Sequence, residues 1–257
     1  MKPEMSLRTI TIVVIGVCAV AFIIFLILKT PRNMDSVYNT YEKPENFTDG
    51  VWIVKYPDNQ TCFRFETPDG RIIVTDPYNM DEIVKPDIVT ISHPHLDHGD
   101  ISSLSKPYEL LTKAGEFNIK GIKITGVAGS HNSGRTLEKN VCNVIYVFDI
   151  DGIKIAQFAS QGALPTKAMF DEIGKVDVLI MQLFSGGGKL SLTECTTIAK
   201  RVEPKIIIAA HGDTTLIGRF AELMDTRVEK SKNGEIIVSK SSLDMIKTPK
   251  VMVLDTY

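Results

Sequence analysis

Three of the five histidines in this 257-residue chain lie in one short stretch, ISHPHLDHGD, residues 91–100. His93, His95, Asp97 and His98 form the pattern H-x-H-x-D-H there. Neutral imidazole and carboxylate groups are natural ligands of Zn²⁺ and related divalent ions. The pattern therefore indicates a metal site, in preference to histidines that only make local hydrogen bonds.

The two remaining histidines, His131 and His211, follow the apolar runs ITGVAGS and KIIIAA, just as the first cluster follows DIVTIS. Runs of this length and composition are typical of β-strands. All five histidines are thus expected at or just after strand ends, where site residues are often carried.

Alternation along an extended chain would place His93, His95 and Asp97 on one side of their loop. His98 would then point in another direction, helped by Gly99. Such a loop can present ligands to two neighbouring metal ions instead of one.

Short apolar runs, rich in Val and Ile, recur from residue 51 onward and predict strands. The sequences are VWIVKY, CFRFE, RIIVTD, DIVTIS, KITGVA, VIYVFDI, KIAQFAS, VDVLIMQLF and KIIIAA. Turn signals at 68–70 (Pro-Asp-Gly) and 151–152 (Asp-Gly) join some of these runs into hairpins.

Helices are predicted later in the chain, at 165–174, 191–202 and 214–225. The first begins with proline and ends with glycine, and the second opens with a capping box from Ser191 to Glu194. Hairpins followed by strand–helix alternation predict an α/β domain with two sheets covered by helices.

H-x-H-x-D-H resembles the signature of the metallo-β-lactamase superfamily. Residues 61–77, TCFRFETPDGRIIVTDP, are similar to that family's opening hairpin, and residues 171–214 are similar to the C-terminal half of its lactonase-like branch. The resemblance covers about residues 51–215. It implies a four-layer αββα sandwich with the site at the edge between the sheets.

By the same resemblance, the family's metal ligands fall on six positions: His93, His95 and His131 for a first ion, and Asp97, His98 and His211 for a second. Asp76 would lie behind them and orient the ligand loop through hydrogen bonds. The implied cofactor is Zn²⁺, as one or two ions, with Mn²⁺ or Fe²⁺ as alternatives.

One departure from the family concerns the aspartate that usually bridges the two metals in a Gly-Asp pair. Ala159 and Ser160 stand at that place. A serine hydroxyl is a poor zinc ligand, so Ser160 is expected to bind weakly at most, and affinity for one or both ions should drop. A subclass of true metallo-β-lactamases is similar, with serine there and two zinc ions bound. A second departure, Asn59-Gln60 where the lactonase-like branch often has Gly-His, weakens any inference about substrate.

The resemblance implies hydrolysis of an ester, lactone, amide or phosphodiester by a metal-bound hydroxide, because the metal lowers the pKa of water to about 7. Asp97 would be the catalytic residue that orients the hydroxide. The alternative is a catalytically weak or inactive module, tethered to a membrane, that binds metal or a partner, because Ser160 replaces the bridge. A small molecule or a lipid or envelope component is the expected substrate. The net charge of −2 favours no nucleic-acid partner.

The segment 9–28, TITIVVIGVCAVAFIIFLIL, carries no charge. A helix of about twenty residues spans a bilayer core of about 30 Å, so the segment predicts an uncleaved single-pass membrane anchor. The predicted organisation is a tail at 1–8, the anchor at 9–28, a polar linker at 29–50 and the hydrolase domain at 51–257. The short tail favours an extracytoplasmic domain, although positive charges are nearly balanced across the segment.

Overall fold

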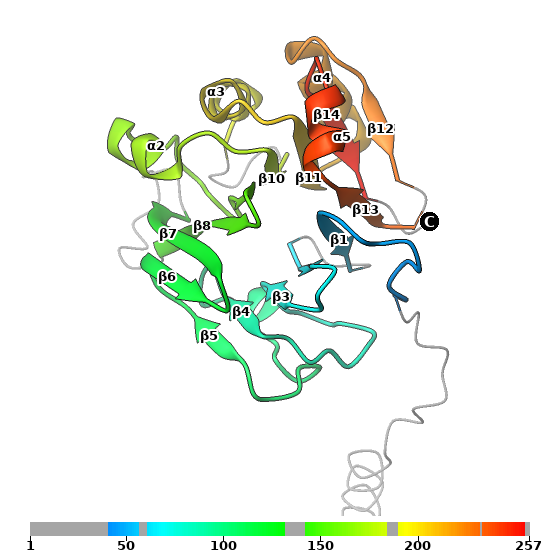
Figure 1. Ribbon diagram of the computed structural model, residues 1–257. Helices are drawn as coiled ribbons and strands as arrows, with labels where there is room; N and C mark the ends of the chain where they lie inside the picture. The colour runs from blue at the N-terminus through cyan, green and yellow to red at the C-terminus, as the bar shows by residue number, and fades with distance from the viewer. Residues whose placement is uncertain (1–40, 57–60, 132–141, 184–189, 232, 255–257) are drawn as a thin grey trace, which may run out of the picture. The chain divides into compact units, whose positions relative to one another are not determined.

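The computed structural model describes residues 41–56, 61–131, 142–183, 190–231 and 233–254 (Figure 1). Every described residue belongs to one compact unit, Thr40–Tyr257.

The predicted anchor, residues 9–28, lies outside the described residues. The predicted membrane localisation is contradicted by the described part of the chain. None of its helices has the length and apolar character needed to cross a bilayer.

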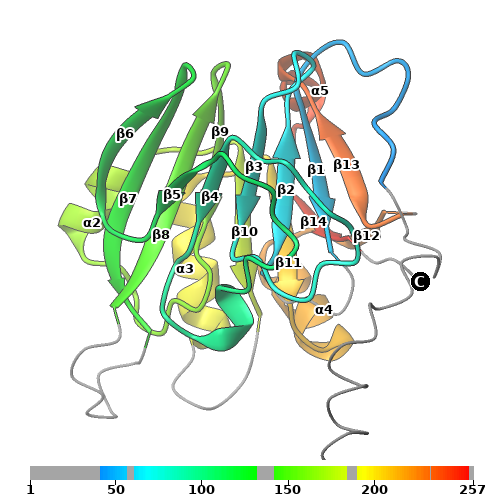
Figure 2. The ribbon, with the colours of Figure 1, turned by 90° about the horizontal axis from the view of Figure 1, so that it is seen from below.

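Two β-sheets of mixed direction face each other in the described part of the chain (Figure 2). The six-stranded sheet has the order β13 (Glu235–Val238), β1 (Val51–Lys55), β2 (Phe63–Glu66), β3 (Ile72–Thr75), β4 (Ile88–Thr90) and β5 (Glu109–Leu111). The eight-stranded sheet has the order β12 (Val228–Lys230), β14 (Lys250–Val253), β11 (Ile206–His211), β10 (Val178–Gln182), β9 (Ile153–Gln157), β8 (Cys142–Ile150), β7 (Ile122–Ser130) and β6 (Gly115–Ile119).

The core between the sheets follows from strand alternation. Val51 and Ile53 of β1 point into it, whereas Trp52 and Val54 point to the other face of their sheet. Phe65 from one sheet meets Phe148 from the other, with ring centroids 5.4 Å apart. Burial of each such side chain stabilises the fold by about 1.5–3 kcal/mol, so this layer holds the two sheets together.

Three helices, α2 (Lys167–Ile173), α3 (Leu192–Val202) and α4 (Thr214–Leu223), cover the outer face of the eight-stranded sheet. The predicted capping box is present at α3, where Ser191 Oγ accepts a hydrogen bond from Glu194 N. A further helix, α5 (Lys240–Met245), follows β13 and sends Leu243 into the core between the sheets. The prediction of an α/β domain with two sheets is confirmed, but in the described part of the chain helices cover the outer face of the eight-stranded sheet and not that of the six-stranded sheet.

The outer face of the six-stranded sheet is covered in the described residues by irregular segments, 41–47 and 77–84. Phe47 packs on Trp52, and the Arg64 guanidinium lies 5.1 Å from the Trp52 ring centroid. Arg64 also pairs with Glu66 and Glu82, all three being largely buried. Residues 41–47, in the second half of the predicted linker, thus pack against the domain. The predicted domain boundaries stay a prediction.

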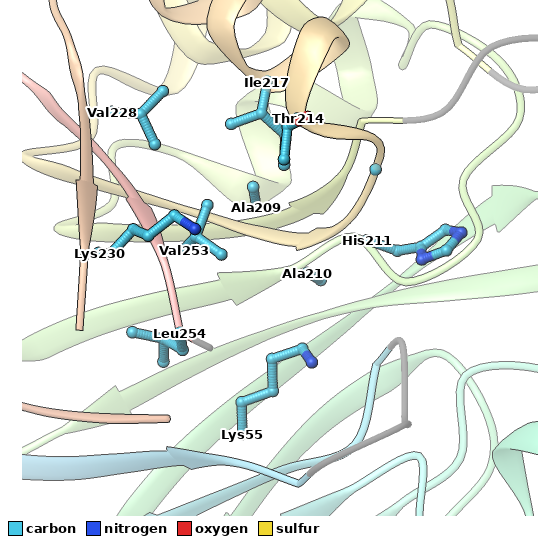
Figure 3. Close-up of a pocket in the computed structure, with 11 residues that line it drawn as sticks. Lys55, Ala209, Ala210, His211, Thr214, Ile217, Val228, Lys230, Val253 and Leu254 are labelled. Carbon is cyan, nitrogen blue, oxygen red and sulfur yellow. The ribbon is translucent and has the colours of Figure 1, made fainter. Parts of the chain in front are cut away.

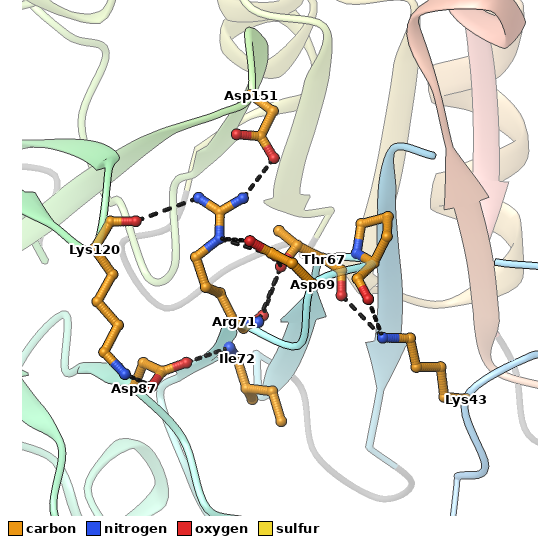
Figure 4. Close-up of polar contacts among 9 residues, drawn as sticks. Lys43, Thr67, Asp69, Arg71, Ile72, Asp87, Lys120 and Asp151 are labelled. Carbon is orange, nitrogen blue, oxygen red and sulfur yellow. Dashed lines mark hydrogen bonds and ion pairs between the residues drawn. The ribbon is translucent and has the colours of Figure 1, made fainter. Parts of the chain in front are cut away.

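Arg71 joins the turns at one end of the sandwich (Figure 4). Its guanidinium donates to Asp69 in the first predicted hairpin turn at 3.0 Å, to Asp151 in the second at 2.6 Å, and to the carbonyl of Lys120 at 3.3 Å. These three turns come from both sheets. Because β7 starts here and β3 runs away from here parallel to β4, the ends of β4 and β7 lie at the opposite end.

Candidate metal centre

The ends of β4 and β7 bring together three of the predicted ligands. His93 and His95 lie on the loop after β4, and His131 directly follows β7. One ligand atom from each of these histidines lies within 4.8 Å of the others, and this is the cluster of metal-ligating groups found among the described residues. Their ring centroids are 4.6 or 4.7 Å apart. The first predicted ligand set therefore converges in space.

A buried hydrogen-bond chain determines which nitrogen of His93 can bind a metal. Ser92 Oγ donates to Asp76 Oδ2 at 2.9 Å and lies 2.9 Å from His93 Nδ1. Since the serine proton is directed to the carboxylate, the serine oxygen accepts the proton of Nδ1. The lone pair of the ring is then on Nε2, which is the form that ligates divalent metals.

Asp76 orients a second imidazole directly. Its Oδ2 is 3.1 Å from His98 Nδ1, and Thr61 Oγ1 is 3.0 Å from the same nitrogen. Its Oδ1 accepts from Ser92 N at 2.7 Å, and the side chain is fully buried. Asp76 therefore holds His98, and His93 through Ser92, in tautomers that present Nε2, while its role behind a bound metal stays a prediction.

The extended backbone assumed for the whole motif ends at His95. Residues Leu96–His98 form a 3-10 turn, which buries His98 beside His93 with ring centroids 4.0 Å apart. The Asp97 side chain is 59% exposed, and its Oδ2 lies 3.8 Å from His98 Nε2. Asp97 thus does not share the side of His93 and His95 as alternation predicted, because a turn of three residues per rotation breaks the period of two.

His211 and Ser160 lie outside the histidine cluster in the described part of the chain. His211 ends β11, where it pairs with Gln182 of β10 beyond a register shift. Ser160 is buried, and its hydroxyl accepts a hydrogen bond of 3.4 Å from Gln182 Nε2. The structure does not gather these two residues with the first ligand set.

Two residues that the sequence did not single out, Gln161 and Asn143, anchor the strand end that carries His131. Gln161 Oε1 accepts from Ser130 N at 3.1 Å and from Asn143 Nδ2 at 3.2 Å, while Gly162 N donates to Ser130 O at 2.7 Å. Both backbone groups of Ser130 are therefore bonded to the 161–162 loop, directly before His131.

Gly129 makes this approach of Gln161 sterically feasible. A Cβ atom at Gly129 would lie 2.3 Å from Gln161 Oε1. No periodicity or motif in the sequence marks these residues, since their contacts join positions that are more than fifteen residues apart.

Cys62 is a neighbour of Thr61 and is fully buried. Burial raises the pKa of its thiol well above the ordinary range. Because the thiolate is the form that binds metals, Cys62 is a poor candidate ligand, which leaves the site to imidazoles and carboxylates.

A cavity of about 710 Å³ adjoins the cluster. His93, His95 and Leu96 line it on one side. Ile91, Ala128 and Val144 supply apolar wall, and Lys113 supplies a positive charge. The volume lies in the range of small-molecule sites.

The donor set fits a divalent metal. Three imidazoles at this separation can reach a single ion, and the Ser92–Asp76 chain fixes the ligand tautomer of His93. Three histidine ligands with positions open to solvent or substrate are a common arrangement for catalytic zinc.

The fold and the sequence are similar to known metal-dependent hydrolases. A protein of Thermotoga maritima, assigned as a zinc-dependent hydrolase of the metallo-β-lactamase superfamily, superimposes with a TM-score of 0.63 and 26% identity, over 79% of this chain and 97% of that one. A protein of Parabacteroides distasonis, assigned as a metal-dependent hydrolase, gives 0.55 and 20% over 68% and 88%.

The same fold also occurs with iron. A diiron β-hydroxylase from Streptomyces venezuelae gives a TM-score of 0.53 at 11% identity, over 77% of this chain and 55% of that chain. No curated protein matches the chain at a significant level.

The family model of the β-lactamase superfamily domain matches residues 56–211, which is more than half of the chain and contains every predicted metal ligand. The resemblance carried by H-x-H-x-D-H is thereby confirmed, and the expectation of an enzyme agrees with the metal-dependent hydrolases among the structural neighbours. This chain belongs to the metallo-β-lactamase branch of that superfamily.

Proposed function

We propose that this protein is a metal-dependent hydrolase whose metal centre is built on His93, His95 and His131. The observation that supports this most is the convergence of three imidazoles from two strand ends at one end of the sandwich. A divalent ion held there, with zinc the best match to the donors and Mn²⁺ or Fe²⁺ as alternatives, would lower the pKa of water and polarise a substrate oxygen.

The residues behind the cluster prepare it for that role. Asp76 directs the ligand nitrogens of His93 and His98 toward the site, as its hydrogen bonds indicate. A carboxylate behind an imidazole also raises the basicity of the ligand nitrogen. Gln161 keeps His131 in place through Ser130.

Asp97 is the residue we assign to proton handling. Its carboxylate is exposed and lies beside His98 Nε2, at 3.8 Å. From there it can accept a proton from the attacking nucleophile and orient it. A second ion would take Asp97, His98 and His211 as ligands, without help from Ser160, whose hydroxyl is bonded to Gln182.

The cavity beside His93 and His95 supports a small-molecule substrate. We expect a small molecule with an ester, lactone, amide or phosphodiester bond, because the cavity has about 710 Å³ and apolar walls with one lysine. The two facing sheets and the helices on the outer face of the larger one correspond to three of the four layers of the αββα sandwich.

Metal analysis of the full chain tests the proposal. Wild type, loaded with zinc and freed of excess metal, should hold about one to two equivalents, and the double variant Asp97→Ala/His98→Ala should retain at most the first ion. Hydrolysis of a panel of aryl esters, lactones and phosphodiesters should fall with the variant. Equal, negligible metal in both proteins would instead indicate an inactive module and would overturn the proposal.

A further inference from the structure

Strand β7 extends past its neighbour β6 on the way to His131 (Figure 2). β6 pairs with β7 only from Ile122 to Gly126, which lies opposite Gly115, the first residue of β6. In the described part of the chain, residues 127–130 therefore have no partner strand on that side. A free strand edge presents backbone N–H and C=O groups that can pair with another chain.

Two hairpin turns determine which residues of this edge point outward. The two-residue turns at Lys120–Gly121 and Asp151–Gly152 have positive φ at both positions, as type I′ turns do. The residues that flank such a turn exchange two hydrogen bonds, and pairs with and without these bonds then alternate along the ladder. Both turns give the same result for β7: even-numbered residues are directed to the β6 side, and odd-numbered residues to β8.

Hydrogen bonds near Ala128 agree with this assignment. Val144 lies opposite Ala128 but donates its N–H to Ser92 O at 2.9 Å. Ser130, two residues further on, bonds through both backbone groups to the 161–162 loop. Ala128 therefore directs its N–H and C=O to the side without a strand, and neither group has a hydrogen-bond partner among the described residues.

Ala128 lies between two cavities. It lines the cavity of about 710 Å³ beside His93 and His95, and also a neighbouring cavity of about 490 Å³ that reaches Met169 of α2. Ala114 is likewise common to both cavities. A chain that passed from one cavity to the other would therefore run past the unpaired N–H and C=O of Ala128.

The cavity at the end of β11 is a different space (Figure 3). It has about 370 Å³, and Lys55, Lys230 and His211 are among the residues that line it. Among the described residues, none that lines it also lines either cavity at Ala128. The path past Ala128 therefore leads to the histidine cluster and not to the end of β11.

We propose that the edge at Ala128 binds a peptide-like substrate by pairing with one of its α-amino acid residues. This inference rests on the proposed hydrolase function and names its substrate class. Opposite residues of an antiparallel ladder exchange two hydrogen bonds, so the occupant must offer an N–H and a C=O from one residue. An ester, lactone or phosphodiester has no N–H to donate to Ala128 O, whereas an N-acylated amino acid residue has both groups. Strand addition of this kind is a recurring mode of peptide recognition.

The spacing along β7 relates the bound chain to the histidine cluster. Ala128 precedes His131 by three residues, which is about 10 Å along an extended strand. An amide bond about three residues from the paired residue thus reaches the cluster. There the oxygen of water adds to the amide carbon, the C–N bond breaks, and the nitrogen leaves with a proton as an amine. The residue paired with Ala128 positions the substrate and is not itself cleaved.

Nuclear magnetic resonance of the full chain, with isotope-labelled alanine and without metal, tests this edge. Titration with the peptide acetyl-Ala-Ala-Ala-amide should shift the amide signal of Ala128. Saturation should slow hydrogen exchange of this amide at least about tenfold, because its free N–H becomes bonded. The signal of Ala156, which is buried in β9, is the control and should not move. Neither metal content nor hydrolysis is measured, so this proposal and the hydrolase proposal can fail separately.

The same peptide methylated on all three alanine nitrogens cannot donate to Ala128 O. It should bind wild type at least about tenfold more weakly in titration calorimetry. Ala128→Pro removes the N–H of the edge at a position where it faces away from β8, and it should weaken binding of the unmethylated peptide by a similar factor. Ala128→Ser keeps the N–H and should bind within about twofold of wild type. An unmoved Ala128 signal, or equal binding of the two peptides by wild type, would overturn the proposal whether or not Ala128→Pro folds.

Discussion

The two sets of ligands that the family resemblance implies are held in different ways. His93, His95 and His131 converge within 4.8 Å with no ion present. The second set is less compact: Asp97 is exposed and lies beside His98, with 3.8 Å between Oδ2 and Nε2, whereas His211 lies outside the histidine cluster of the described residues. The six ligand positions that the family resemblance implies are therefore not equivalent in space.

The difference follows from what lies behind each ligand. Ser92 and Asp76 hold His93, and Gln161 holds the strand end before His131. Asp97 projects from a three-residue turn, and Ser160 stands where a carboxylate would attract a second ion. Supporting hydrogen bonds organise a site before its ligand arrives. The first set is thus preorganised, and the second set would be completed by the ion.

Replacing one histidine of each set tests this directly. His93→Ala should reduce bound zinc to less than about 0.1 equivalent and hydrolysis at least about 100-fold, because the preorganised set loses a ligand. His211→Ala should keep about one equivalent. The measurement is elemental analysis after gel filtration. If both variants lose the same amount of metal, the two sets are not distinct.

Asp76→Asn tests whether one carboxylate supports both sets. The amide has one acceptor oxygen, so it cannot accept from Ser92 N at the Oδ1 position and from Ser92 Oγ and His98 Nδ1 at the Oδ2 position. Metal affinity should therefore fall about 10–100-fold and the free energy of unfolding by about 2–4 kcal/mol. Asparagine tolerates the positive φ of 44° at this position, which limits backbone effects. Chelator competition and urea unfolding measure the two quantities. Reduced stability with unchanged metal affinity would show that Asp76 only supports the fold.

Gln161→Ala tests the support of His131 alone. Loss of the bond to Ser130 N should weaken binding of the first ion about tenfold and cost about 1–2 kcal/mol of stability. Gln182→Ala is the matched control, because Gln182 contacts Ser160. It should leave first-ion affinity within about twofold. If Gln182→Ala weakened binding of the first ion more than Gln161→Ala does, Gln161 would not be the residue that supports the first set.

The buried thiol of Cys195, on α3, belongs to neither ligand set and gives a reference for the pH dependence of stability. Burial raises the pKa of the Cys195 thiol to about 12. In the unfolded chain the thiol titrates near 8.5, so its contribution to stability is complete below that pH and is lost as the pH rises toward 12. The stability difference between wild type and Cys195→Ala should narrow by up to about 1.4 kcal/mol per pH unit in this window. Urea unfolding at several pH values measures it, and a constant difference would contradict the assignment.

Local patterns in the chain were sufficient for much of this protein. Short apolar runs located the strands β1–β4 and β7–β11, the turn signals at 68–70 and 151–152 located two hairpins, and the Ser191 capping box located α3. These features depend on neighbours a few residues apart, which is why they can be recognised without coordinates. The same holds for H-x-H-x-D-H, whose spacing indicated the metal-binding loop. The predicted membrane localisation also came from local hydropathy, and it is contradicted by the described part of the chain, where no helix has the length and apolar character to cross a bilayer.

Contacts between distant segments lie beyond such patterns. The bond from Gln161 to Ser130, the turn that separates Asp97 from His95, and the cavity shared by Lys55 and Lys230 each depend on how strand ends and loops meet after the sheets have packed. A side chain acquires these partners through three-dimensional proximity, which its sequence neighbours do not encode. The sequence therefore indicated which residues can bind a metal. Which of these residues form a preorganised site was decided only by the tertiary structure.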